Sequence, residues 1–197
     1  DFPLKIQLIL QYLHKKNQCF LGGNRNLCNK NCYFLTNLRY ILYMDENQKD
    51  FERLKRAFNI KDGEDIWVFA YGSLMWNPDF VFEEVQPAHV CGYHRRFCLK
   101  CDYHRGKPEA HGLVLGLDRG GSCHGLAYRL APQHLHKALS MLWKREMWVA
   151  DAYLPRRVPV TINNDFENKI PACVFVSNPK SSYYYDEKCR KKAAEII

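Results

Sequence analysis

The sequence contains no long apolar run: none approaches the roughly 20 consecutive residues that a helix needs to cross a membrane. We therefore expect no membrane-spanning segment. A secretory signal is not expected either, because Lys5, Gln7 and Gln11 interrupt the first apolar stretch and no small-residue cleavage site follows it. The first residue is Asp1 and not an initiator methionine, which indicates a fragment or a processed product.

The sequence also lacks the dense, even set of cysteines that is typical of small secreted domains. Its 9 cysteines are odd in number and are scattered from Cys19 to Cys189. We interpret them as mostly reduced thiols, which predicts a cytoplasmic protein.

Acidic residues are in the minority: 21 Asp and Glu stand against 29 Lys and Arg, for a formal net charge of +8. Such a charge permits contact with nucleic acid or another anionic surface. The basic residues are spread along the chain, however, and cluster only at residues 94–96 and 188–192. A small anionic substrate would suit this charge equally well, so we expect no nucleic-acid partner.

The chain divides into two regions of different character. Residues 1–63 are expected to form a partly helical N-terminal extension, with amphipathic helices over 3–16 and 45–58 and no chemical motif. Residues 64–197 are expected to form the main domain, which is rich in strands.

The main domain is predicted to combine strands and helices without regular alternation. Strands are expected over 66–71, 85–90, 95–101, 153–162 and 170–176. A hairpin is expected over 112–130, with its turn at Asp118-Arg119-Gly120-Gly121. Helices are expected over 132–147, opened by Pro132, and from about 186 onward. This order predicts an α+β fold with a mostly antiparallel, barrel-like sheet.

The first candidate functional segment is the stretch from Trp67 to Trp76. Its first half is apolar and β-prone, which predicts a short buried strand, and the strand is expected to end at Gly72-Ser73. A strand that ends in a small-residue loop can expose backbone N–H groups that bind an anion or a carbonyl oxygen. It can equally form an ordinary turn.

The second candidate is Glu146, which continues the apolar stripe of Leu135, Leu139 and Leu142 on the predicted helix. A carboxylate that points at a core loses its hydration, which raises its pKa and lets it accept and return a proton near neutral pH. The alternative is a solvated carboxylate at a frayed helix end, paired with Arg145 or Lys144.

The sequence also contains a candidate metal site, because His94, Cys98, Cys101 and His104 are residue types that bind zinc. The segment is predicted to be a strand, in which Cys98 and Cys101 would point to opposite faces. A second ligand pair is not evident from spacing, and Cys28 with Cys32 would require a long-range contact. The spacing therefore gives little support to a metal site.

Taken together, the motifs resemble those of the ChaC family of glutathione-specific γ-glutamylcyclotransferases. The resemblance covers about residues 64–178, in the family's order and at similar spacing. The matching segments are 67–78 (WVFAYGSLMWNP), 92–98 (GYHRRFC), 104–106 (HRG), 112–117 (GLVLGL), 121–123 (GSC), 125–130 (GLAYRL) and 142–147 (LWKREM).

The resemblance implies a small, mostly antiparallel β-barrel flanked by helices. It also implies a lyase activity, the cleavage of glutathione to 5-oxoproline and cysteinylglycine, without a metal or an organic cofactor. It implies that Glu146 transfers the proton, and we expect a monomer without membrane contact. The substrate-binding residues that it implies are Val68, Phe69, Ala70, Tyr71, Gly72, Ser73 and Leu74. Because the substrate's own amine is the nucleophile, Ser73 is not expected to attack.

The sequence leaves two alternative functions open, and it departs from the family's pattern in two places. The same fold can act on other γ-glutamyl amines, or can persist as a basic binding module without activity. Ala70 stands where the family usually has glycine, and its methyl group would be strained if the position required a positive φ. The sequence stops at Ile197, before the family's usual C-terminal segment; if the protein ends there, one wall of the site is expected to be either missing or replaced, with residues 183–185 as the candidate replacement.

Overall fold

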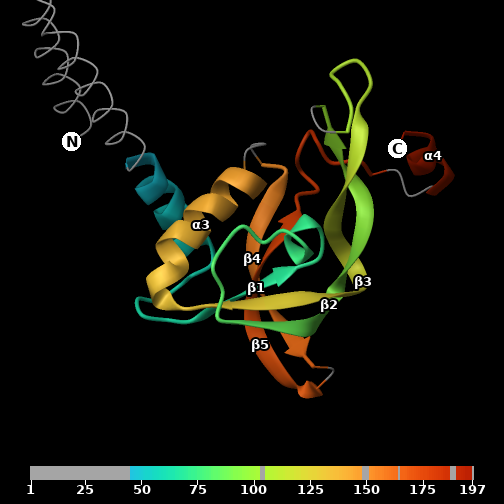
Figure 1. The fold of residues 1–197 in the computed structure, drawn as a ribbon. Helices are drawn as coiled ribbons and strands as arrows, with labels where there is room; N and C mark the ends of the chain where they lie inside the picture. Colours follow the sequence, from blue (N-terminus) through green and yellow to red (C-terminus); the bar gives the residue numbers. More distant parts are fainter. Residues whose placement is uncertain (1–44, 103–104, 148–150, 164, 187–189, 197) are drawn as a thin grey trace, which may run out of the picture. The chain divides into compact units, whose positions relative to one another are not determined.

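A computed structural model describes residues 45–102, 105–147, 151–163, 165–186 and 190–196 (Figure 1). The predicted helix over 3–16 and the residues Cys28, Cys32 and His104 lie outside these ranges. The helix predicted over 45–58 is confirmed and occupies residues 45–57. The remaining elements are β1 (Ile66–Ala70), the 3-10 turn η1 (Ser73–Met75), β2 (Glu84–Cys101), β3 (Gly112–Leu130), α3 (Pro132–Glu146), β4 (Tyr153–Ile162), β5 (Asp165–Ser177) and α4 (Arg190–Ile196).

The strands of the described residues close into a barrel in the order β1-β3-β2-β4-β5. The β1–β5 pair is parallel and the other pairs are antiparallel. The predicted α+β fold with a mostly antiparallel barrel flanked by helices is therefore confirmed. The described residues include no helix that is both long enough and apolar enough to span a membrane.

The hairpin predicted over 112–130 is wrong, because β3 runs without a turn through the whole stretch. Its true hairpin partner is β2, so the strands predicted separately over 85–90 and 95–101 are one strand. Gly92 on β2 lies opposite Gly120 and Gly121 on β3, and all three have positive φ. The resulting bulge bends both strands around the barrel, as Figure 1 shows.

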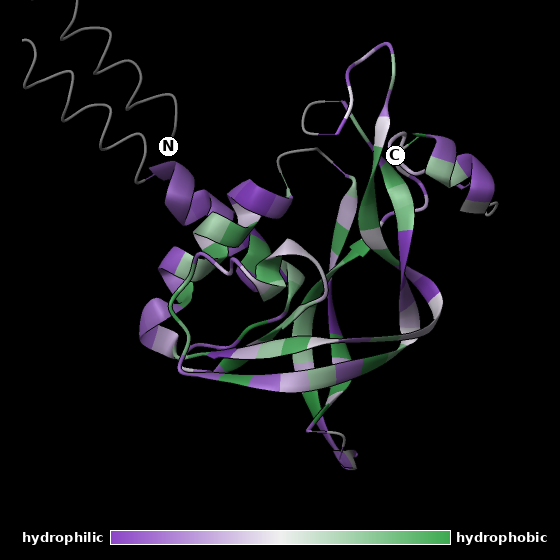
Figure 2. Ribbon diagram, turned by 45° about the vertical axis from the view of Figure 1, so that its right-hand side comes forward, coloured by the Kyte–Doolittle hydropathy of each residue, from purple (hydrophilic) through white to green (hydrophobic). Residues whose placement is uncertain are grey.

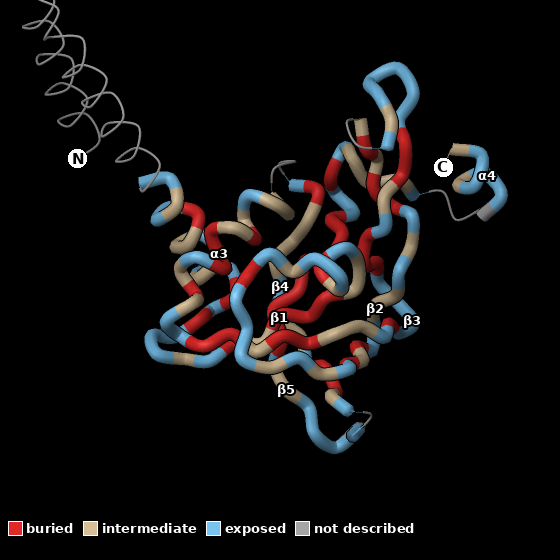
Figure 3. The backbone as a smooth tube through the Cα atoms, viewed as in Figure 1, coloured by how far each residue is buried: buried red, intermediate tan, exposed pale blue. Residues whose placement is uncertain are grey.

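The core has two parts that meet at β1. Val68 and Ala70 belong to the hydrophobic cluster beneath α3. Phe69 belongs to a second cluster, which is formed by residues of the barrel strands. Hydrophobic residues follow the barrel strands, while the tips of the long hairpins are hydrophilic and exposed (Figures 2 and 3). Ala70 is an extended strand residue that is paired with Leu126 and is not among the residues with positive φ, so its methyl group is not strained.

The helix over residues 45–57 packs on the same core through Leu54, and Phe58 follows at its end. Polar contacts join this helix to α3: the Ser140 hydroxyl donates to the Asn47 carbonyl at 2.8 Å, and Lys144 Nζ donates to Asn47 Oδ1 at 2.6 Å. These contacts fix the helix against the apolar stripe of α3.

A methyl group at Gly125 should disrupt the barrel, because a Cβ there would lie 2.2 Å from the Ala70 carbonyl oxygen and 2.9 Å from Phe69 Cζ. We expect Gly125→Ala to lower the free energy of unfolding by more than about 2 kcal/mol. The control is Gly72→Ala, since a Cβ at Gly72 meets no atom within 4 Å. Urea unfolding that showed equal losses for both variants would contradict this close-packing argument.

Candidate active site

The chain leaves the barrel at Tyr71 and turns through Gly72 into η1. The carbonyls of Tyr71, Gly72 and Ser73 each accept a hydrogen bond from the protein. Arg95 Nε donates to the Tyr71 carbonyl at 2.6 Å, the Met75 N–H donates to the Gly72 carbonyl at 2.9 Å, and the Asn77 N–H donates to the Ser73 carbonyl at 3.0 Å. Each of these three carbonyls therefore already accepts a hydrogen bond from the protein.

Arg145, near the end of α3, ties the helix to this turn. Its Nη2 donates to Ser73 Oγ at 2.8 Å, and its Nη1 donates to the Asn77 carbonyl at 2.6 Å and to Asp79 Oδ2 at 2.8 Å. Arg145 Nε also lies 3.5 Å from Glu146 Oε1. One guanidinium thus fixes the last turn of α3 against the segment from Ser73 to Asp79.

Glu146 is the last residue of α3, and its side chain is 15% exposed. Burial raises the pKa of its carboxyl above the usual range, although the positive charge of Arg145 lowers it. Glu146 therefore combines the predicted desolvation with the predicted ion pair to Arg145. The other proposed partner, Lys144, is directed to Asn47.

The Glu146 carboxylate borders a small cavity of about 60 Å³. The cavity is lined by Phe69, Tyr71, Gly72, Ser73, Leu74, Leu115, Glu146, Tyr153 and Phe175. Five of the seven residues predicted to bind substrate are in this lining, whereas Val68 and Ala70 direct their side chains into the core. Val68 and Ala70 can contribute to binding only through their backbone.

Two partly buried tyrosines, Tyr71 and Tyr153, line the cavity with Glu146. Tyr71 donates its hydroxyl hydrogen to the Phe175 carbonyl at 2.9 Å, and Tyr71 and Tyr153 are joined by a side-chain hydrogen bond. Burial, with a further contribution from the Glu146 charge, raises the pKa of both phenols. Both hydroxyls are therefore neutral at physiological pH, so they add no charge to the cavity.

The cavity shares Gly72, Ser73, Leu115, Glu146 and Tyr153 with a larger groove of about 530 Å³. This volume lies within the range of about 300–1,000 Å³ that is typical of small-molecule sites. The groove is lined on its apolar side by Trp76, Phe97, Leu99, Leu113, Leu115 and Tyr183, and it carries the charged residues Lys100, Asp102, Arg105, Arg145 and Glu146.

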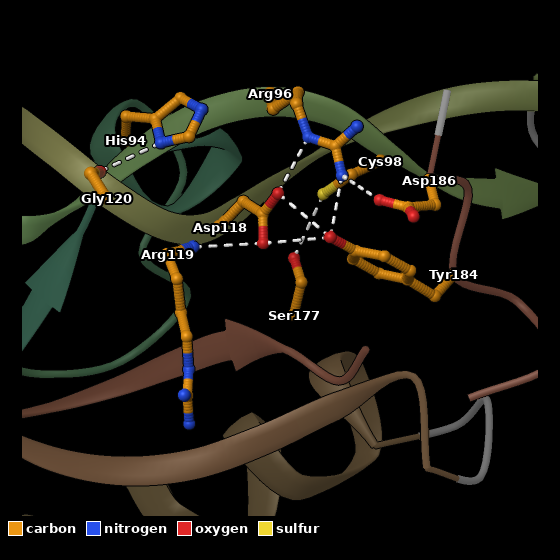
Figure 4. A network of polar contacts seen from close by, with 9 residues as sticks. All are labelled: His94, Arg96, Cys98, Asp118, Arg119, Gly120, Ser177, Tyr184 and Asp186. Atoms are coloured by element: carbon orange, nitrogen blue, oxygen red, sulfur yellow. Dashed lines mark hydrogen bonds and ion pairs between the residues drawn. The ribbon is translucent and has the colours of Figure 1, made fainter. Parts of the chain in front are cut away.

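Tyr183, from the segment after β5, lines the groove, and its neighbours Tyr184 and Tyr185 bond to the strands. The Lys100 N–H donates to the Tyr183 carbonyl at 2.8 Å, and the Tyr185 N–H donates to the Cys98 carbonyl at 2.8 Å. The hydroxyl of Tyr184 lies 3.0 Å from Asp118 Oδ2 and accepts from Arg96 Nη2 at 2.7 Å. Figure 4 shows this network, in which β2, β3 and the segment converge.

The metal-site alternative gains no support from the described residues. No group of three or more His, Cys, Asp and Glu residues that could hold a metal ion occurs among them. Cys98 and Cys101 are both buried, because the bulge between Phe97 and Leu99 shifts the alternation of β2. His94 lies at the bend, where its Nδ1 is 2.9 Å from the Gly120 carbonyl oxygen. The cysteines in the described ranges are free thiols.

Tyr153 and the groove residues of β2 and β3 were missed by sequence reasoning. Tyr153 opens β4 without any local signal of a site, and barrel closure alone brings it to Glu146. A partial signal existed for Arg145, which was considered only as a solvated partner of Glu146. Its bonds to Ser73 and Asp79 depend on contacts more than 60 residues apart in sequence.

Loss of the Asp118 charge should loosen the groove wall formed by the segment after β5. Arg96 Nε lies 2.7 Å from Asp118 Oδ2, and the two side chains are only 16% and 11% exposed. We expect Asp118→Asn to lower the free energy of unfolding by about 1–3 kcal/mol. Tyr184→Phe removes one hydroxyl only and should cost about 1 kcal/mol. Urea denaturation measures both, and an unchanged Asp118→Asn variant would show that the pair does not hold the wall.

Comparison with known proteins agrees with this architecture. The glutathione-specific gamma-glutamylcyclotransferase of Escherichia coli strain K12 is 36% identical over 132 residues, which are 67% of this chain and 56% of that protein. The human glutathione-specific gamma-glutamylcyclotransferase 1 is 33% identical over 128 residues, which are 64% of this chain and 57% of that protein. The chain thus spans about half the length of these curated relatives.

The barrel also matches a solved structure. The crystal structure of a yeast gamma-glutamyl cyclotransferase specific to glutathione superimposes with a TM-score of 0.61 at 19% identity, over 68% of this chain and 77% of that chain. At this identity the match shows a shared fold. The model of a family described as ChaC-like protein matches residues 66–197. The chain therefore belongs to the ChaC-like family.

Proposed function

We propose that this protein cleaves glutathione by cyclising its γ-glutamyl group, which yields 5-oxoproline and cysteinylglycine. The observation that carries the proposal is the poorly hydrated Glu146 carboxylate beside the cavity formed by residues 71–74. The names of the bacterial and human relatives, which specify glutathione, support the choice of substrate.

The reaction needs no nucleophile from the protein. The α-amine of the γ-glutamyl group attacks its own γ-carbonyl carbon, a C–N bond closes the five-membered ring, and the amide C–N bond to cysteine breaks. A cavity that holds the chain folded for ring closure brings the two groups together, and such preorganisation can contribute several kcal/mol. The main task of the protein is therefore to position the substrate and to move protons.

Glu146 is suited to moving those protons. The α-ammonium must lose a proton before it can attack, and a carboxylate with a raised pKa accepts one more readily than a fully hydrated carboxylate. The leaving amide nitrogen must gain a proton as the C–N bond breaks, and protonated Glu146 returns one. N–H groups of the Tyr71–Ser73 turn would stabilise the negative charge on the substrate.

The side chain of Ser73 is not assigned a covalent role. Its Oγ accepts from Arg145 Nη2 at 2.8 Å, which makes it part of the link between the turn and α3. We propose that it maintains the cavity wall. We further propose that the protein acts as a monomer in the cytoplasm on this small substrate, since its odd set of 9 scattered cysteines suits a reducing compartment.

Replacement of Glu146 by Gln should abolish turnover without harming the fold. We expect release of 5-oxoproline from glutathione to fall by at least about 100-fold, because the proton carrier is lost. Because burial disfavours the ionised carboxylate, the neutral amide should leave the melting temperature at pH 7 unchanged or higher. A Glu146→Gln variant that retained turnover would refute the mechanism, and Glu109→Gln on the exposed β2–β3 connection is the matched control.

The charge of Arg145 should set the acidic limb of the pH profile. Glu146 acts as a base only above its pKa, so kcat/KM should fall as the pH drops through that value. Since the Arg145 charge lowers the pKa of Glu146, Arg145→Gln should move this limb to higher pH. Arg145→Lys retains a positive charge and should leave the limb nearer its original position, even if both variants are slower. If the acidic limbs of wild type, Arg145→Gln and Arg145→Lys coincide, the assignment of this limb to Glu146 is contradicted.

A further inference from the structure

We propose that the end of the groove away from Glu146 is a carboxylate-binding subsite, in which Lys100 and Arg105 bind the terminal carboxylate of the leaving cysteinylglycine. This inference rests on the proposed function and deepens it, because it assigns a part of the protein to the leaving half of glutathione.

The two carboxylates of the groove already have partners. Asp102 is bonded to His111, and Glu146 lies 3.5 Å from Arg145. Among the described residues, by contrast, the side chains of Lys100 and Arg105 form no hydrogen bond or ion pair. Two cations of the groove therefore lack a counter-charge from the protein, and an anionic group of the ligand would supply one.

The distance of Lys100 from the small cavity matches the length of the leaving group. Leu115 lines both the small cavity and the groove, and Lys100 is paired with Leu113, two residues further along β3. At about 3.3 Å per strand residue, this places Lys100 roughly 7 Å from the level of Leu115. Two extended residues such as Cys-Gly also span about 7 Å. The terminal carboxylate thus reaches Lys100 when the γ-carbonyl lies in the cavity.

The groove between these two points is apolar. Phe97, Leu99 and Leu113 line it, and this surface suits the small, weakly polar side chain of cysteine. The wall that Tyr183 forms is fixed beside Lys100, because the Lys100 N–H donates to the Tyr183 carbonyl. The neighbouring Tyr184 is held by Arg96 and Asp118 (Figure 4). The position of the Lys100 backbone is thereby defined.

The test compares glutathione with its C-terminal glycine amide, which is neutral where glutathione carries the carboxylate. We expect wild-type kcat/KM for the amide to be about tenfold lower, mainly through KM, because the carboxylate contact is made equally before and during the chemical step. Lys100→Gln and Arg105→Gln should each raise KM for glutathione while leaving the amide unaffected. Lys137→Gln, on the exposed face of α3, removes the same charge away from the groove and should change neither substrate.

The outcomes separate the two proposals. If both substrates are turned over equally well, or if the lysine and arginine variants slow both by the same factor, the carboxylate subsite is overturned and the cyclotransferase activity stands. If neither substrate releases 5-oxoproline, the proposed function fails and the subsite fails with it. A wild-type preference for glutathione over the amide that Lys100→Gln and Arg105→Gln reduce, by slowing glutathione turnover alone, supports the subsite.

Discussion

The site depends on one guanidinium that binds two separate parts of the chain. Arg145 bonds to Ser73, Asn77 and Asp79 on one side and lies against Glu146 on the other, so the turn after β1 and the last turn of α3 keep a fixed separation. The same charge limits how far burial raises the pKa of the Glu146 carboxyl. Arg145 therefore influences both the geometry of the site and the pKa of Glu146.

The bend of the barrel supplies the rest of the site. Gly92, Gly120 and Gly121 let β2 and β3 curve, and their far halves then bring Phe97, Lys100, Leu113 and Leu115 alongside the cavity. Because the chain after β5 is bonded to β2 at Cys98 and Lys100, the groove gains a wall from a segment that is remote in sequence. The groove is thus assembled from segments that no short motif contains.

Sequence reasoning was most successful where local pattern decides structure. The bounds predicted for β4 agree with the structure, and the stripe of Leu135, Leu139 and Leu142 identified α3 and the inward direction of Glu146. The prediction of a turn at Gly120-Gly121 failed, because glycines with positive φ occur in turns and in β-bulges alike. Only the pairing with β2 around Gly92 distinguishes the two. Tyr153 could not be predicted, since barrel closure places it, and the hydrogen bond that holds Tyr183 beside β2 is likewise a long-range contact.

The central claim is that the attacking group is the substrate's own amine and that water takes no part in breaking the amide bond. Turnover of glutathione in water enriched in oxygen-18, followed by mass spectrometry, tests it most directly. The account predicts 5-oxoproline and cysteinylglycine that carry no label. Glutamate with oxygen-18 in its γ-carboxylate would show hydrolysis and would contradict the account.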